Sequence, residues 1–189
     1  FINAHQINTI CWVVPALTMI SGLGAFEKAV PSSLKTIAFG SEVFPARQLA
    51  LWRKYVPNAR YINLYGPTEA TGMSCYYVVD REFKEDEVIP IGRPFPNTGI
   101  LLLNEDGKEV TQGEKGEICI RGTAVTMGYY RQPEKTAGNF VQNPLNKDYP
   151  EIIYKTGDLG YYNDRGELMF ASRKDYQIKH MGHRIELGE

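Results

Sequence analysis

One short segment of the chain, NLYGPTEAT, gathers side chains of several chemical types within a few positions. Tyr65 offers an aromatic face on which a base could stack, and Asn63 offers an amide for a base edge. Gly66 would let the backbone approach a ligand closely. Thr68 could donate a hydrogen bond to a phosphate at a helix start, and Glu69 carries the hard oxygens that suit Mg²⁺. These residue types would suit the floor of a nucleotide site.

The same residues also permit a purely structural interpretation. Gly66 and Pro67 could form a tight turn before a short helix starting near Thr68. The Thr68 hydroxyl could then cap that helix, and Glu69 would favour the helix dipole. The segment by itself leaves both interpretations open.

The residues before this segment predict alternating strands and helices, in the order TICWVV, PALTMISGLGAF, LKTIAF, GSEVFPARQLALWRKYV and ARYINLY. Pro15 opens the first helix, and Pro45 falls in the first turn of the second. In that helix Leu49, Trp52 and Val56 share one face. The alternation predicts parallel βαβ units, in which ligands bind beyond the carboxyl ends of the strands. NLYGPTE follows a strand and is therefore at such a position.

After about residue 85 the pattern changes to β-runs separated by Asn-, Asp- and Arg-Gly turns, which is typical of hairpins. One helix is expected at QPEKTAGNF. We therefore predict an α/β part over residues 1–88 and a small β-barrel-like part over 89–172. The charged SRKD then leads into the hinge and start of a truncated C-terminal α+β domain, residues 173–189.

Composition sets limits on location and partners. The net charge is −1 and no Lys/Arg run exceeds two residues, so a nucleic-acid surface is not indicated. No apolar run approaches the length of a membrane span. Three widely spaced cysteines favour a reducing cytosol over a disulfide framework. Because the chain starts at Phe1 rather than Met, we expect it to be a fragment of a longer protein.

Four motifs in order resemble those of one family, the amino-acid-activating adenylate-forming (AMP-binding) enzymes. NLYGPTEAT resembles the central motif of nonribosomal peptide synthetase adenylation domains and D-alanine–carrier-protein ligases. KGEICIRGTAVTMGYYRQPEKT resembles the motif GEL-x-I-x-G…GY, and YKTGDLG resembles Y-[RK]-T-G-D-L. SRKDYQIKHMGHRIELGE resembles G-R-x-D-x-Q-[IV]-K-x-x-G-x-R-[IVM]-E. Together they cover residues 63–189, and IGRPFPNTG between them also fits.

The resemblance implies a fold and a two-step reaction. The family core carries two α/β subdomains and a small β-barrel, joined by a hinge to a mobile C-terminal domain. A substrate carboxylate attacks the α-phosphate of Mg·ATP, which gives an acyl-adenylate and pyrophosphate. The phosphopantetheine thiol of a carrier protein then captures the acyl group. The expected cofactors are ATP and Mg²⁺, and the expected partners are an amino acid and a carrier protein.

The resemblance also implies roles for the residues of the opening segment. Asn63 would bond the adenine edge, and Tyr65 would stack on its face. Thr68 would hold the α-phosphate, and Glu69 would bind Mg²⁺. Gly66 would belong to the same nucleotide site, where its backbone could approach the ligand closely.

Four downstream residues receive roles in the same way. Asp158 would accept hydrogen bonds from both ribose hydroxyls, as a carboxylate can, although a turn aspartate is the structural alternative. Arg173 would contact the ribose and phosphate region, with a solvated surface charge as its alternative. Asp175 would be the hinge whose backbone rotates between the half-reactions. Lys179 would lie near the pantetheine entry, or be a salt-bridged surface lysine.

The acyl pocket of the family corresponds here to six uncharged positions, Ile37, Phe39, Gly40, Leu64, Gly72 and Met73. Burial of an uncompensated charged substrate side chain would be costly among them. The bulk of Phe39, Leu64 and Met73 favours a small apolar side chain. Alanine or D-alanine is our hypothesis, and the alternative is that these residues form core.

Other residues are expected to be structural. Gly116, Glu117 and the segment 128–130 should shape the barrel. His180 and His183 have the spacing of a metal pair, but no further ligand is placed to complete a zinc set, and the family has a strand turn there. His5 lies near the family's acyl-pocket region but is expected at the surface.

Departures from the family pattern limit the expected activity. The phosphate loop with its lysine, the aspartate that pairs with the substrate amino group and the C-terminal catalytic lysine have no counterpart in the sequence. Ser172 replaces the usual glycine, and KHMGHR differs from K-I-R-G-x-R. We expect the parent protein to form adenylate and the fragment alone to be inactive. The alternatives are an acyl-CoA ligase of the same superfamily, a non-catalytic carrier-docking scaffold and a plain nucleotide-binding module.

Overall fold

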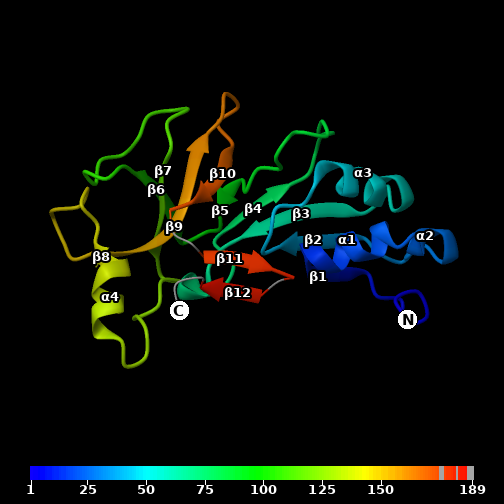
Figure 1. Cartoon of the computed structure of the whole chain (residues 1–189), viewed down its shortest axis with the longest axis horizontal. Coiled ribbons are helices and arrows are strands. Elements are labelled where there is room, and N and C mark those ends of the chain that lie inside the picture. Colours follow the sequence, from blue (N-terminus) through cyan, green and yellow to red (C-terminus); the bar gives the residue numbers. More distant parts are fainter. Residues whose placement is uncertain (175–176, 182, 187–189) are drawn as a thin grey trace. The chain divides into compact units, whose positions relative to one another are not determined.

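The computed structural model describes residues 1–174, 177–181 and 183–186 (Figure 1). The chain divides into two compact units. The first comprises residues 1–64 and 77–90 with the C-terminal hairpin, and the second comprises 65–76 and 91–176. The boundary between Pro90 and Ile91 falls two residues from the change of pattern near residue 88. The NLYGPTE segment, which the sequence assigns to the α/β part, groups from Tyr65 onward with the β-rich unit.

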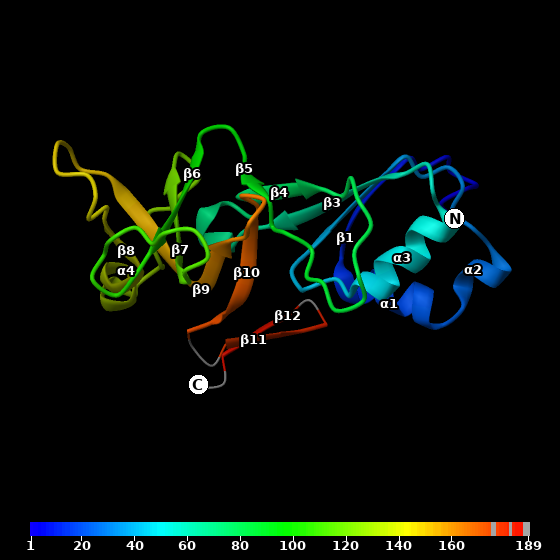
Figure 2. The ribbon, with the colours of Figure 1, turned by 90° about the horizontal axis from the view of Figure 1, so that it is seen from above.

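The first unit is built on three parallel strands in the order β1-β2-β3. Their bounds are β1 Thr9–Val13, β2 Thr36–Gly40 and β3 Arg60–Tyr65. Helices α1 (Val14–Gly22) and α2 (Ala25–Lys28) connect β1 to β2, and α3 (Ala46–Tyr55) connects β2 to β3. The predicted βαβ pattern and parallel sheet are therefore confirmed. Figure 2 shows the three helices gathered together beside these strands.

Two helix boundaries differ from the sequence prediction. The segment from Pro15 to Phe26 forms two helices because Gly24, between them, adopts a left-handed conformation with φ of 64°. Pro45 is the N-cap of α3 rather than a residue of its first turn. The cap has an extended backbone, and no side chain caps either α1 or α3.

The core of the first unit lies between these helices and the strands. Leu49, Trp52 and Val56 are all buried, as their shared face predicted. The indole Nε1 of Trp52 donates a hydrogen bond of 2.9 Å to the carbonyl of Leu17, so α3 is tied to α1. Phe26 packs edge-on against Trp52. A buried aromatic with a satisfied polar group fixes the helices against each other.

The second unit is dominated by antiparallel strands. β5 (Arg93–Pro94) pairs with the first residues of β4 (Cys75–Val78), and these two strands follow β3 in the order of the first sheet. A second five-stranded sheet has the order β10-β9-β7-β6, with β8 beside β9. It contains β6 Thr98–Leu103, β7 Gly116–Gly122, β8 Phe140–Gln142, β9 Ile152–Tyr162 and β10 Leu168–Arg173. The one helix expected in this part is present as α4 (Pro133–Asn139). The sheet curls into a half-barrel, which agrees with the predicted small barrel.

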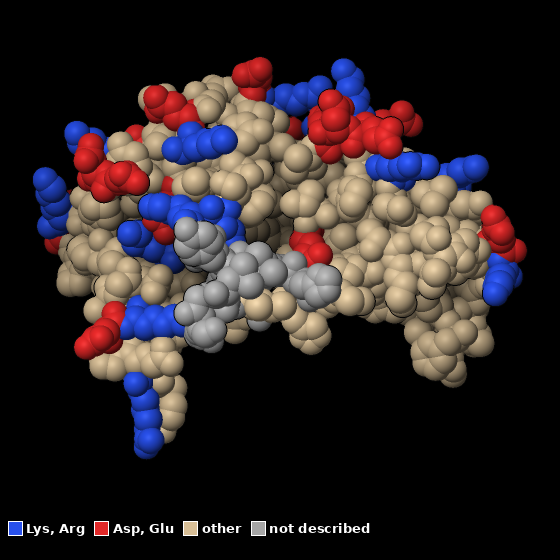
Figure 3. Space-filling model, viewed as in Figure 1, with Lys and Arg blue, Asp and Glu red and all other residues tan. Residues whose placement is uncertain are grey.

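Side chains on the two faces of this sheet form separate core clusters. Leu102, Ile118 and Leu168 pack on one face, and Leu103 and Ile153 pack on the other. Along β6, Ile100 and Leu102 belong to one cluster and Leu101 and Leu103 to the other, so successive side chains point to opposite faces as in any strand. On the face drawn in Figure 3, acidic and basic side chains lie next to one another at several places.

All three cysteines are free, Cys11 being exposed and Cys75 and Cys119 buried. Burial raises the pKa of the Cys75 and Cys119 thiols to about 12, so both stay protonated near neutral pH. Among the described residues, no helix has the length and apolar character that crossing a membrane requires. The hairpin of β11 (Gln177–His180) and β12 (His183–Glu186) ends the described chain, and its backbone pairs His180 with His183 next to the turn.

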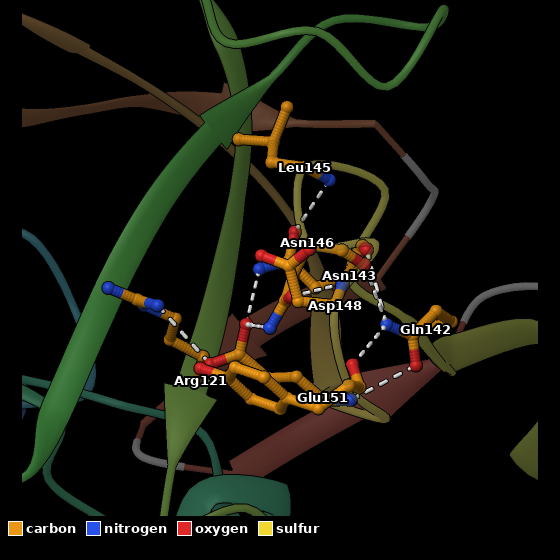
Figure 4. A network of polar contacts seen from close by, with 8 residues as sticks. Arg121, Gln142, Asn143, Leu145, Asn146, Asp148 and Glu151 are labelled. Carbon is orange, nitrogen blue, oxygen red and sulfur yellow. Dashed lines mark hydrogen bonds and ion pairs between the residues drawn. The ribbon is translucent and has the colours of Figure 1, made fainter.

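The loop between β8 and β9 is held by a polar network around Glu151 (Figure 4). Its Oε2 accepts hydrogen bonds from the side-chain amides of Asn143 at 2.6 Å and Asn146 at 3.3 Å. Its Oε1 lies 3.2 Å from Nη1 of Arg121. The bonds from Asn143, followed by those from Asn146 and Arg121, hold the pKa of Glu151 below its ordinary value of 4.5.

Replacing Glu151 with glutamine should lower the free energy of unfolding by about 1 kcal/mol at pH 7. The amide can serve as acceptor at only one of the two positions, so either Arg121 or the Asn143–Asn146 pair loses its partner. Because the folded-state pKa is lowered, the carboxylate stabilises fully above its ordinary pKa. This contribution is lost as the pH falls through the lowered value, so urea titrations should show the difference shrinking below pH 4.5. Glu105→Gln, at an exposed loop position, is the control, and an equal loss in both variants would contradict the network's role.

Candidate functional site

The site is built on a bulge in β9. Between the pairs Glu117–Leu159 and Cys119–Lys155, the single residue Ile118 of β7 faces three residues of β9, Thr156 to Asp158. This is the TGD of the sequence motif. Gly157 lies within the bulge with φ of +74°, a conformation that favours glycine. Such bulges re-aim side chains that a regular strand would direct elsewhere.

Hydrogen bonds within the sheet hold this bulge in shape. The Thr156 hydroxyl donates to the carbonyl of Ile118 at 2.7 Å and accepts the backbone N–H of Asp158 at 3.0 Å. The backbone N–H of Gly157 donates to Oε1 of Glu117 at 3.0 Å. Thus a threonine and a glutamate satisfy backbone groups that the interrupted ladder cannot.

Asp158 is the centre of the site. Its Oδ2 accepts a hydrogen bond of 2.6 Å from the Tyr65 hydroxyl, and its Oδ1 lies 2.6 Å from Nη1 of Arg173. Arg173 is placed there by the strand register, since it pairs directly with Asp158 across β9 and β10. Burial, followed by the charge of Asp158, raises the pKa of Tyr65 well above its usual value, so Tyr65 remains a hydrogen-bond donor. Three residues proposed for the nucleotide, distant in sequence, therefore meet.

The loop after Tyr65 is compact because Gly66 has no side chain. A Cβ at this position would lie 2.2 Å from the carbonyl oxygen of Gly72 and 2.5 Å from the backbone nitrogen of Ser74. The loop is closed by a 2.7 Å hydrogen bond from the Ser74 N–H to the Tyr65 carbonyl. Gly66 thus has a structural requirement in addition to its proposed role beside a ligand.

Thr68 and Glu69 lie in a three-residue 3₁₀ helix, η1 (Thr68–Ala70). Its N-cap is Pro67 and no side chain caps it, so the alternative that Thr68 is a capping residue is wrong. Thr68 is exposed, whereas Glu69 is buried with 6% exposure. The Tyr129 hydroxyl donates to Oε1 of Glu69 at 2.8 Å, and the Thr126 N–H donates to its carbonyl at 2.9 Å. Glu69 is therefore fixed by the segment that carries the GYY residues.

Four of the candidates in the first unit are Asn63, Ile37, Phe39 and Gly40. Asn63 is buried, and its amide donates a 2.8 Å hydrogen bond to the carbonyl of Pro90. Ile37 and Phe39 are fully buried in the core cluster, as the structural alternative for them states. Gly40 is required by packing, because a Cβ there would lie 2.5 Å from the carbonyl oxygen of Leu64.

The remaining pocket candidates divide between the units: Leu64 is in the first, and Gly72 and Met73 are in the second. Gly72 has a positive φ of 89°, and Met73 is 41% exposed. Whether they form one acyl pocket with Ile37 and Phe39 stays a prediction.

Two further candidates belong to the C-terminal motif. Asp175 lies outside the described residues. Lys179 is placed by its backbone alone, in β11, where it pairs with Arg184.

The sequence interpretation missed the contributions of Tyr129, Thr156 and Glu117. The sequence motifs predict that the GE and GYY residues shape the barrel, yet Tyr129 contacts Glu69 and Glu117 contacts the bulge. In the sequence, the indication of their importance is that all three residues lie within the family motifs. The spacing of 60 residues between Tyr129 and Glu69 leaves no local pattern from which the contact could be predicted.

Residues 1–130 match the family described as AMP-binding enzyme. The chain belongs to this family. Its similarity lies with nonribosomal peptide synthetases: it is 40% identical over 188 residues to bacitracin synthase 1 of Bacillus licheniformis. It is also 36% identical over 182 residues to delta-poly-L-ornithine synthetase of Acinetobacter baumannii.

The fold agrees with this assignment. The structure of holo-PA1221, an NRPS protein containing adenylation and PCP domains bound to a vinylsulfonamide inhibitor, matches with a TM-score of 0.89 and 28% identity. That match covers 99% of this chain and 32% of the other. The two synthetase matches cover 100% and 96% of this chain but only 4% and 13% of the relatives. The chain thus corresponds to a small part of each.

Proposed function

We propose that the chain is part of an ATP-dependent ligase that activates an amino acid as its adenylate and passes it to a carrier-protein thiol. The observation that carries the proposal is the meeting of Tyr65, Asp158 and Arg173 on the TGD bulge. In the first step a substrate carboxylate oxygen bonds to the α-phosphorus of ATP, and pyrophosphate leaves. In the second, the phosphopantetheine sulfur replaces AMP at the acyl carbon, and the thiol proton is lost.

The Asp158 carboxylate suits a ribose. A carboxylate carries two acceptor oxygens, so one carboxylate can accept the two O–H groups of a ribose diol. The oxygens of Asp158 are held in place by the Tyr65 hydroxyl and the Arg173 guanidinium. Tyr65 and Arg173 hold its orientation, so little conformational entropy would be lost on binding.

The donor set near η1 suits a magnesium-bound phosphate. Glu69 supplies carboxylate oxygens held in place by Tyr129, and Thr68 supplies an exposed hydroxyl. Among the described residues no group of three or more His, Cys, Asp or Glu is placed to hold a metal ion by itself. Mg²⁺ is commonly bound by one or two carboxylates together with substrate phosphates and water. When bound, the ion would neutralise phosphate charge, and Glu69 would position it.

The proposed substrate is an amino acid with a small apolar side chain, such as alanine or D-alanine. Support comes from the uncharged character of the pocket candidates and the bulk of Phe39, Leu64 and Met73. The synthetase relatives favour an amino acid over the fatty or aryl acid of an acyl-CoA ligase. The proposed carrier-protein partner is supported by the similarity to PA1221, which contains adenylation and PCP domains. The proposed cytoplasmic location is supported by the three free cysteines.

ATP–pyrophosphate exchange by the full-length protein that carries this chain tests the proposal. The panel should contain small, bulky and charged amino acids together with fatty and aryl acids. We expect exchange with small amino acids. A preference for charged or bulky amino acids would refute the pocket proposal, and a preference for fatty or aryl acids would favour an acyl-CoA ligase. Absence of both exchange and calorimetric ATP binding would support a scaffold.

A further inference from the structure

Glu117 is a buried carboxylate with three cationic or N–H neighbours. It is 7% exposed, and its Oε1 accepts the N–H of Gly157 in the bulge. Its Oε2 lies 3.5 Å from Nζ of Lys174 and 3.7 Å from Nζ of Lys155. Burial of a carboxylate is costly unless hydrogen bonds and opposite charges compensate it, and here both are present.

The chain at Arg173 and Lys174 is attached to the same bulge. The Arg173 guanidinium contacts Asp158, and the backbone N–H of Lys174 donates a 2.8 Å hydrogen bond to the carbonyl of Gly157. The ammonium group of Lys174 reaches Glu117, which itself contacts Gly157. Two consecutive residues are thus connected to the ribose-site bulge through both backbone and side chains. The next residue is Asp175, the proposed hinge.

We infer that Glu117 is a positioning residue: through Lys174 and Gly157 it fixes the segment entering the hinge against the bulge that carries Asp158. This inference rests on the proposed function. A conformation that keeps these contacts is stabilised relative to one that breaks them. The ion pair therefore favours the arrangement in which Arg173 lies at the ribose site, where adenylate forms. Loss of the pair shifts the balance away from that step.

The structure supplies a matched pair of variants. Lys174 and Lys155 contact the same carboxylate oxygen at similar distances, and their side chains are 38% and 41% exposed. Replacement by methionine removes one positive charge in each case and retains most of the apolar stem. Only Lys174 belongs to the segment that precedes Asp175. A general effect of charge on Glu117 is thus separated from an effect on that segment.

The experiment uses the full-length protein that carries this chain. Two rates are compared: adenylate formation, measured by pyrophosphate exchange, and thiol capture, measured in a single turnover. Lys174→Met should lower the ratio of the first rate to the second by about three- to fivefold. This is the range expected for a partly exposed ion pair. Lys155→Met should leave the ratio unchanged. Glu117→Gln keeps an acceptor for the Gly157 N–H but loses the charge, and it should reproduce the Lys174→Met change. Thermal unfolding of each variant verifies that it is folded.

The outcomes separate this inference from the function on which it rests. If the unmodified protein exchanges no pyrophosphate with any acid, the proposed function fails, and the inference fails with it. If the unmodified protein is active, equal ratios for Lys174→Met and Lys155→Met overturn the positioning role and leave the function standing. An unchanged ratio in Glu117→Gln overturns it as well.

Discussion

Replacement of Asp158 by asparagine is expected to lower the free energy of unfolding of this chain by about 2 to 3 kcal/mol. Asp158 is 8% exposed and receives both the Tyr65 hydroxyl and the Arg173 guanidinium, each at 2.6 Å. A neutral amide keeps the shape of the side chain but places an NH₂ group against one of these donors. Arg173 then loses the charge of its partner in a largely buried position. Urea unfolding at neutral pH measures the change.

The control for this substitution is Asp164→Asn. Asp164 lies in the turn between β9 and β10 and is exposed, so its change should stay within about 0.5 kcal/mol. Similar losses for the two variants would show that Asp158 does not hold the site together. From the proposed role of Asp158 at the ribose, Asp158→Asn should also weaken ATP binding by the full-length protein, because the proposed contact loses a charged acceptor.

Replacement of Gly66 by alanine should cost about 2 to 3 kcal/mol of folding free energy. The added methyl group would lie 2.2 Å from the carbonyl oxygen of Gly72, 2.5 Å from the Ser74 nitrogen and 2.9 Å from the Met73 Cα. All three neighbours are backbone atoms, so no side-chain rotation can relieve the clash. The loop that begins at Tyr65 must open, and thermal unfolding should report a lower Tm.

Gly138→Ala is the matched control and should have the opposite sign. Gly138 lies in α4, and a Cβ there would meet nothing within 4 Å. Alanine at a helical position stabilises by up to about 1 kcal/mol relative to glycine. A Gly66→Ala protein as stable as the Gly138→Ala protein would mean that the 66–74 loop tolerates the methyl group.

The local architecture was predictable from sequence because it depends on local patterns. The strand and helix alternation before Tyr65, the face shared by Leu49 and Trp52, and the hairpin turns all have short-range causes. The division of the first helix was not predicted, because its cause is the backbone conformation of Gly24.

The site was only partly predictable. Family motifs identified Tyr65 and Asp158, but nothing local indicates that residues separated by 93 positions share a hydrogen bond. The bulge arises from the mismatch between β7 and β9, a property of the pairing and not of either strand. The contact of Glu117 depends on this bulge, and the contact of Tyr129 depends on the η1 loop. Neither contact could be predicted without the structure.

The grouping of residues 65–76 with the β-rich unit has a consequence for recombination between relatives. A chimera that exchanges residues 1–64 and 77–90 would inherit Tyr65, Glu69, Tyr129 and Asp158 from one parent. The contacts of Tyr65 with Asp158 and of Glu69 with Tyr129 would then join residues of the same parent. A junction placed after the whole NLYGPTEAT motif would instead join a tyrosine from one lineage to an aspartate from another. Module exchange in synthetases is thus better guided by these contacts than by the edges of sequence motifs.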